Sequence, residues 1–116
     1  MSKILLTVNG ETFRATLESN HAVEAFLNRL PIVIKMNEMN GNEKYYDFSE
    51  GFPTESERVD RVKSGELMLF GSNTLVLFYK NFSTAYTYTR LGALDNLSNL
   101  AKVLGRKDVS VKIEQE

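Results

Sequence analysis

Apolar and polar side chains alternate over several short segments of the chain, as in strands that bury one face. The first two such segments are residues 4–8 and 12–17, and Asn9-Gly10 lies between them. Asn-Gly favours a two-residue type I′ turn, because both central residues of that turn need a positive φ. The chain is therefore predicted to begin with a β-hairpin.

A helical spacing of apolar residues replaces this alternation between residues 21 and 30. Apolar side chains recur there at the i, i+3, i+4, i+7 positions that form one buried helix face. Ser19 or Asn20 can cap the first turn, and Pro31 disfavours the helical conformation of the residue before it. The sequence therefore predicts a short helix over residues 21–30.

Further strands and one more helix are predicted downstream. Residues 40–42 suit a turn, Asp95 suits the start of a helix with an apolar stripe, and Gly105 suits its end. The predicted strands cover residues 32–37, 43–48, 67–70, 75–79, 85–93 and 109–114, and the second helix covers residues 96–104.

Two parts of the chain depart from simple alternation. Residues 67–70 and 75–79 are continuously apolar, which indicates strands covered on both faces, as at the centre of a barrel flanked by helices. Residues 49–64 contain Gly51, Pro53 and many charged side chains but little to bury. We expect this segment to be the longest loop, and such loops are often functional or mobile.

These elements predict a mainly β fold. About eight short strands and two short helices, with no repeat and no linker, are typical of a closed barrel or a sandwich. A length of 116 residues is that of one ordinary domain. We therefore expect a single domain over residues 1–116, a small closed β-barrel whose two helices cover its open ends.

Composition and charge narrow the range of partners. Lys and Arg number 14 against 15 Asp and Glu, so the formal net charge of −1 gives no sign of the basic surface that nucleic-acid binding needs. Cysteine is absent, which excludes thiolate chemistry and Cys-based zinc sites. No apolar stretch approaches the length of a membrane span or a signal-peptide core. We expect a cytoplasmic protein with neither nucleic-acid nor membrane partners.

Candidate catalytic and metal-binding residues are few. His21 is the one histidine, and its place at a helix start favours a capping or solvated role over general-base chemistry. Glu38 and Glu43 flank a turn, where paired carboxylates can bind metal or transfer protons, although acidic turn residues are usually surface residues. No phosphate loop or nucleophile elbow is present. The sequence predicts no metal and no cofactor.

The order of these features resembles a known family. Residues 20–27 resemble the first helix of cyclophilins, and residues 65–79 resemble their central hairpin. Leu30-Pro31 after the helix and Glu43 in the following turn are similar to residues that recur in a small, compact prokaryotic group described as cyclophilin-like. The resemblance covers nearly the whole chain and depends on the order of the motifs.

The resemblance implies a cyclophilin-like barrel, and cyclophilins are peptidyl-prolyl cis–trans isomerases. Those enzymes place an arginine and a glutamine-rich segment on the strands after the first helix, with aromatic residues around a proline pocket. Residues 32–48 contain neither Arg nor Gln, and Lys35 and Lys44 lack the planar fork of a guanidinium. We therefore expect a noncatalytic binding or interaction module, with a weak or altered isomerase as the alternative.

Candidate ligand-binding residues come from several strands. Tyr86, Tyr88 and Arg90 share a strand face, and form either a half-exposed cross-strand cluster or an aromatic binding face in which Arg90 recognises a carboxylate. A surface that is apolar with a few polar groups suits a pocket. The expected ligand is an unknown peptide, protein or small molecule, bound by a monomer or weak dimer. The candidate set is Met36, Glu43, Met68, Phe70, Phe78, Tyr88 and Arg90.

Overall fold

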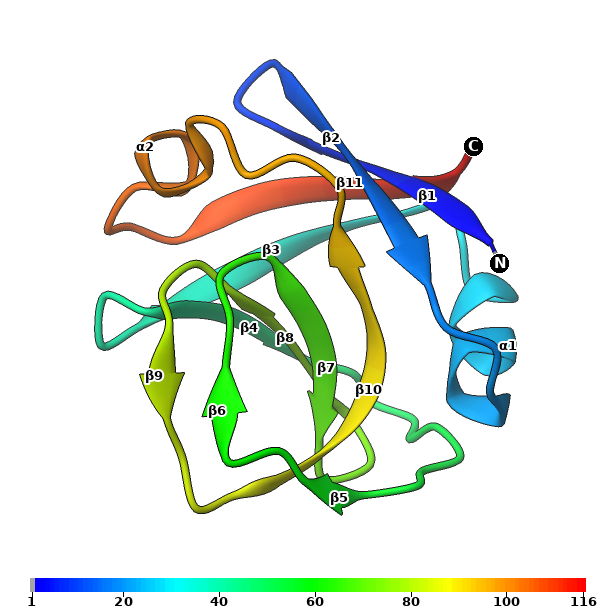
Figure 1. The fold of residues 1–116 in the computed structure, drawn as a ribbon. Coiled ribbons are helices and arrows are strands. Elements are labelled where there is room, and N and C mark those ends of the chain that lie inside the picture. Colours follow the sequence, from blue (N-terminus) through cyan, green and yellow to red (C-terminus); the bar gives the residue numbers. More distant parts are fainter. Residues whose placement is uncertain (1) are drawn as a thin grey trace.

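A computed structural model describes residues 2–116, and it confirms the predicted mainly β fold (Figure 1). The barrel strands are β1 (Lys3–Val8), β2 (Glu11–Leu17), β3 (Ile32–Met39), β4 (Glu43–Asp47), β7 (Glu66–Phe70), β8 (Thr74–Phe78), β10 (Thr87–Leu94) and β11 (Val109–Gln115). Their order around the barrel is β2-β1-β11-β3-β4-β8-β7-β10, and a further pairing of β10 with β2 closes the ring. Every neighbouring pair is antiparallel.

A second, smaller layer lies outside the barrel and is built from β5 (Glu57–Arg58), β6 (Arg61–Val62) and β9 (Phe82–Ser83). Strand β5 pairs with the first half of β10, and β6 pairs with β9. The segment 49–64 was expected to have little to bury, and this expectation is wrong, because Phe52, Val59 and Val62 are all buried. Isolated apolar side chains thus hold this charged segment against the barrel.

Strands β7 and β8 are buried on both faces, as their continuous apolar runs predict. Side chains that point inward from them, such as Leu69 and Leu75, join a large inner core that fills the barrel. Those that point outward join a separate outer cluster, which consists of Val59, Val62, Met68, Val76, Phe78 and Tyr88 with Tyr45 and Phe82 packed against it. The outer face is therefore covered by the β6–β9 pair and not by helices.

Helix α1 (His21–Leu27) covers one end of the barrel and buries Ala22, Val23 and Phe26. The Asn20 side chain accepts a hydrogen bond of 2.8 Å from the Val23 N–H, which confirms Asn20 as its cap. The helix ends earlier than residue 30, because the chain tightens into i→i+3 hydrogen bonds before Pro31. Among the described residues, no helix has the length and apolar character needed to cross a bilayer.

Helix α2 (Leu100–Leu104) covers the opposite end of the barrel, near the β1–β2 and β3–β4 turns (Figure 1). Its predicted start at residue 96 is wrong. Asp95 does not cap it, because the Asp95 carboxylate accepts a 2.6 Å hydrogen bond from the Thr16 hydroxyl on β2. Gly105 does form the predicted C-cap, with a φ of 64°.

Two glycines allow the barrel to form. The first hairpin turns as predicted, with φ values of 48° at Asn9 and 81° at Gly10. Gly92 lies at the β10–β2 seam, beside a bulge in the pairing of β10 with β7. A Cβ atom at Gly92 would lie 2.3 Å from the Thr16 carbonyl oxygen and 2.8 Å from the Leu17 Cα, so only glycine lets the two backbones approach.

We expect Gly92→Ala to destabilise the fold by about 3 kcal/mol, the upper part of the range for overpacking, because backbone on β2 must shift. Gly71→Ala is the matched control, since no atom lies within 4 Å of the added Cβ and only its φ of 61° is unfavourable. Urea denaturation of both variants measures the difference. An equal loss in the two variants would show that the seam tolerates a side chain.

Candidate ligand-binding site

A cavity of about 740 Å³ lies on the outer face of the barrel, and we call it the outer cavity. Its walls come from the outward-facing residues of β4 and β8, from the ends of β3 and β7, and from the segment that runs through β9 into β10. Side chains alternate along β4, so residues 43, 45 and 47 all reach this face. The lining residues are Met39, Asn40, Asn42, Glu43, Tyr45, Asp47, Phe70, Thr74, Val76, Phe82, Ser83, Thr84, Ala85, Tyr86 and Tyr88.

Aromatic rings form a continuous series along the wall and floor of the outer cavity. Tyr86 meets the Phe70 ring at a centroid distance of 5.6 Å, and Phe70 meets Tyr88 at 5.7 Å. Tyr88 then contacts Phe78 at 5.5 Å, and Phe78 contacts Phe82 at 5.6 Å. These tilted and edge-on contacts are favourable for aromatic pairs. They fix the segment around β9 to the outer face of the sheet.

Glu43 is a half-buried carboxylate in the wall of the outer cavity. No hydrogen bond to its carboxylate is found among the described residues. Burial, together with the negative charge of Glu38, raises its pKa above the ordinary value. Burial and the charge of Glu43 likewise raise the pKa of Tyr88. The outer cavity thus contains an acidic group without a partner.

Asn42, another lining residue of the outer cavity, contains an unpaired acceptor. Its side-chain oxygen is shielded from solvent and has no hydrogen-bond partner among the described residues. Buried polar atoms are nearly always paired in folded proteins. Because this oxygen is shielded, Asn42 contributes to the wall of the cavity and not an accessible acceptor.

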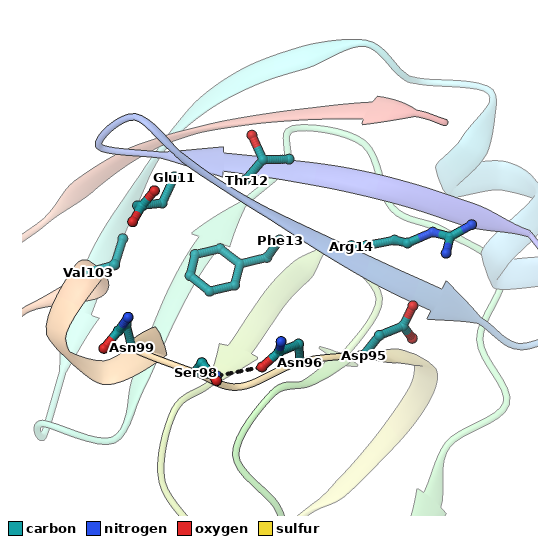
Figure 2. Close-up of a pocket in the computed structure, with 9 residues that line it drawn as sticks. All are labelled: Glu11, Thr12, Phe13, Arg14, Asp95, Asn96, Ser98, Asn99 and Val103. Carbon is teal, nitrogen blue, oxygen red and sulfur yellow. Dashed lines mark hydrogen bonds between the residues drawn. The ribbon is translucent and has the colours of Figure 1, made fainter.

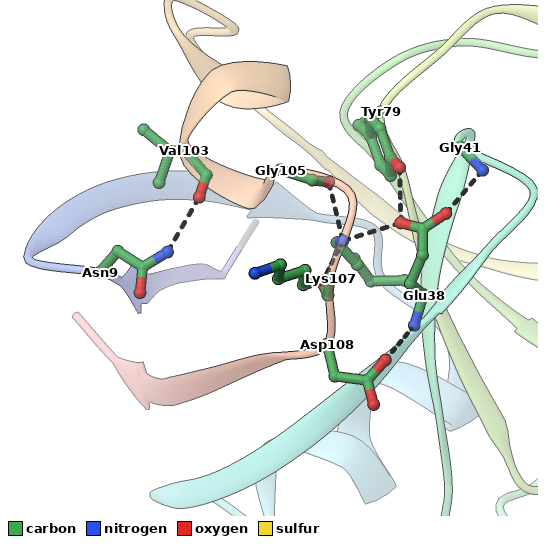
Figure 3. A network of polar contacts seen from close by, with 9 residues as sticks. Asn9, Glu38, Gly41, Tyr79, Val103, Gly105, Lys107 and Asp108 are labelled. Atoms are coloured by element: carbon green, nitrogen blue, oxygen red, sulfur yellow. Dashed lines mark hydrogen bonds and ion pairs between the residues drawn. The ribbon is translucent and has the colours of Figure 1, made fainter.

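A buried ion pair joins Lys44 on β4 to Glu38 on β3, and Figure 3 shows Glu38 with its hydrogen bonds from Tyr79 and the Gly41 N–H. The Lys44 side chain is fully buried, and its Nζ donates to Glu38 Oε1 at 2.8 Å, to the Gly105 carbonyl at 2.9 Å and to the Lys107 carbonyl at 2.6 Å. Burial opposes ionisation of Glu38, but hydrogen bonds from Lys44, Tyr79 and the Gly41 N–H outweigh it and lower its pKa. Burial and the bond to Glu38 raise the pKa of Tyr79 to about 12.

The structure brings together most of the residues that the sequence singles out for ligand binding. Glu43, Phe70 and Tyr88 line the outer cavity, and Met68 and Phe78 are buried in the outer cluster beneath it. Two residues lie elsewhere. Met36 is buried in the inner core, and Arg90 is held by ion pairs of 3.1 Å to Glu57 and 3.1 Å to Glu66.

Several lining residues lie outside the predicted set. Met39 ends β3 as the register partner of Glu43, and Phe82 and Thr84 lie on the segment around β9. Tyr45 and Tyr86 could have been found, because alternation places them on the same strand faces as Glu43 and Tyr88. Asn42 carries no signal in the sequence, since its turn position alone explains its residue type.

A second cavity, of about 270 Å³, lies between β2 and the segment before α2 (Figure 2). Phe13 forms its floor, and most of its other lining residues are polar. Two of its charged residues are already paired, since Arg14 bonds Glu116 at 2.6 Å and Asp95 bonds Thr16, and Glu11 is its other charged lining residue. This second cavity is therefore a weaker candidate than the outer cavity.

Comparison with known proteins identifies the family. The sequence model described as the cyclophilin-like family matches residues 6–114. The chain belongs to this cyclophilin-like family. Neither a curated protein nor a solved structure gives a significant match to the chain. Family membership and the barrel agree with the resemblance seen in the sequence, and neither specifies a ligand.

Two cations of this cyclophilin-like barrel, Arg90 and Lys44, lie near the outer cavity but do not converge on it as members of a catalytic group would. Arg90 points to the same outer face but contacts its own two glutamates, and Lys44 points into the barrel. Among residues 2–116, no group of three or more His, Cys, Asp or Glu side chains is placed to hold a metal ion. The outer cavity therefore offers shape, aromatic surface and acceptors.

We expect Glu38→Gln to destabilise this cyclophilin-like protein by about 3 kcal/mol at neutral pH, because the buried Lys44 ammonium loses its counter-charge. The stability that Glu38 contributes is present above the ordinary carboxyl pKa of 4.5 and is lost as pH falls through its lower folded value. The difference between wild type and variant should therefore narrow below about pH 4.5. Chemical denaturation at several pH values measures it.

Glu43→Gln is the control for this experiment. This variant also changes a carboxylate to an amide, on β4 beside the β3 strand that carries Glu38. The pKa of the Glu43 carboxyl is raised, however, so ionisation of Glu43 in the folded state is unfavourable. We expect this variant to be as stable as wild type at neutral pH, or more so. A loss in Glu43→Gln as large as in Glu38→Gln would contradict the assignment of Glu38 as the counter-ion.

Proposed function

We propose that the chain is a noncatalytic binding module whose outer cavity holds a ligand with an apolar or aromatic part. One observation carries this proposal. Three of the five large apolar side chains that remain exposed in residues 2–116 line the outer cavity: Met39 at 41%, Phe70 at 44% and Tyr86 at 64%. Exposed apolar side chains gathered around a hollow mark a binding surface, whereas scattered ones need no explanation.

The construction of the outer cavity supports this proposal. The Tyr88 and Phe78 rings beneath its surface are buried, so the exposed rings of Phe70 and Tyr86 stand on a packed base. A base of this kind limits the conformational entropy that binding removes. The cysteine-free composition supports a cytoplasmic setting, and the likeness of the sequence to a prokaryotic group supports a prokaryotic one.

The proposal predicts that indole, as a neutral aromatic probe, binds in the outer cavity. In a two-dimensional ¹H–¹⁵N spectrum, we expect the largest shift changes at Phe70, Thr74 and Tyr86. Tyr86→Ala should weaken binding by about threefold to tenfold, the equivalent of one aromatic contact.

Val33→Ala is the matched control for the indole experiment. Val33 is also an exposed apolar residue, at 71%, on the same barrel but outside the outer cavity. Its loss should leave indole binding unchanged. Shift changes centred away from the outer cavity, or equal binding by the Tyr86→Ala variant and wild type, would refute the proposed site.

A weak or altered peptidyl-prolyl isomerase is the second candidate function, because an aromatic cavity of this kind suits a proline ring. The ion pairs of Arg90 with Glu57 and Glu66 support the noncatalytic function, since they occupy the guanidinium that the sequence singles out on this face. We expect no acceleration of Xaa-Pro isomerisation at micromolar protein in a protease-coupled assay, where the uncatalysed step takes tens of seconds. A rate that rises in proportion to protein concentration would establish the isomerase instead.

A further inference from the structure

The charged groups that line the outer cavity are all of one sign. Its two charged lining residues are the carboxylates Glu43 and Asp47, and its described lining residues include neither Lys nor Arg. Lys44, the neighbour of Glu43 in the sequence, points into the barrel and pairs with Glu38, and Arg90, which points to the same outer face as the cavity, pairs with Glu57 and Glu66. The outer cavity is therefore a locally acidic hollow on a chain whose formal net charge is only −1.

The aromatic lining has the same electrostatic preference. The face of each ring carries negative potential, so a cation within about 6 Å of the ring centroid is attracted. Phe70, Tyr86 and Tyr88 contact one another around one side of the outer cavity, and Tyr45 lies on the same strand face as Glu43. A positive group between these rings and the carboxylate would interact favourably with both.

Hydrogen-bonding capacity leads to the same kind of ligand. The Glu43 carboxylate can only accept hydrogen bonds while it is ionised, and no donor to it is found among the described residues. A ligand group with several N–H donors would satisfy it, and an anionic or purely accepting ligand would not.

We propose that the ligand of the outer cavity is an organic cation, an ammonium group on an apolar body, with Glu43 as its counter-ion. This inference rests on the proposed binding function and specifies the ligand class. The apolar body packs against Phe70 and Tyr86, whose rings are the exposed part of the aromatic series. An ammonium group beside Glu43 also offsets the free-energy cost of ionising this half-buried carboxyl, whose pKa is raised when no ligand is bound.

A pair of probes with one body and two head groups tests this inference. Phenethylamine carries an ammonium at neutral pH, because a primary alkylamine titrates near the lysine pKa of about 10. 2-Phenylethanol has the same phenylethyl body and a neutral hydroxyl. We expect phenethylamine to bind at least about tenfold more tightly, as a cation among rings beside a carboxylate should. Isothermal titration and the shift changes at Phe70 and Tyr86 measure both dissociation constants and the place of binding.

Glu43→Gln identifies the counter-ion. This variant should reduce the advantage of phenethylamine to within about threefold, while 2-phenylethanol binds as it does to wild type, which also shows that the cavity is intact. Glu18→Gln changes an exposed carboxylate outside the outer cavity, so it is the matched control and should keep the full advantage of phenethylamine.

A capped tripeptide with one central lysine tests whether the ammonium belongs to a peptide or to a small amine. Whichever binds more tightly, the tripeptide or phenethylamine, identifies the source.

The outcomes separate this inference from the proposed function. If the amine and the alcohol bind the outer cavity equally, or if Glu43→Gln keeps the preference, the cation inference is wrong and the binding module stands. If neither probe nor indole changes the signals of the outer cavity, the proposed function fails and the inference fails with it. A preference for the amine that needs Glu43 supports both.

Discussion

The burial of Phe78 on the outer face of β8 holds the candidate site together. Its ring is completely buried and touches Phe82 on β9 and Tyr88 on β10, so it fixes the outer layer to the barrel. The same strand sends Leu75 and Leu77 into the inner core, because its side chains alternate. Barrel and outer cavity are thus two sides of one strand.

Charge is separated across β4 in the same way. Lys44 points inward to a buried pair with Glu38, and Glu43, its neighbour, points outward into the outer cavity. Glu38 acts on both sides, because it neutralises Lys44 and its charge also raises the pKa of Glu43. Glu38 therefore links the two sides of β4, although burial is the larger cause of the raised pKa of Glu43.

Alternation and turn chemistry predict the fold well, since most barrel strands bury one face, the continuously apolar strands β7 and β8 bury both, and Asn9-Gly10 turns as its residue types require. Features that depend on distant partners could not be predicted. Asp95 looks like a helix cap, but it bonds Thr16, 79 positions away in the sequence. Met36 and Met68 occupy equivalent-looking strand positions, yet one enters the inner core and the other the outer cluster, because periodicity does not specify which face is inside. Arg90, the expected anchor, finds Glu57 and Glu66 within its own chain.

The most direct measurement of the central claim is a crystal structure of the protein with phenethylamine bound. The account predicts the ammonium within hydrogen-bond distance of the Glu43 carboxylate, about 2.7–3.2 Å, with the phenyl ring against Phe70 and Tyr86. The amine bound at another surface, or bound in the outer cavity with its ammonium directed away from Glu43 into solvent, would contradict it.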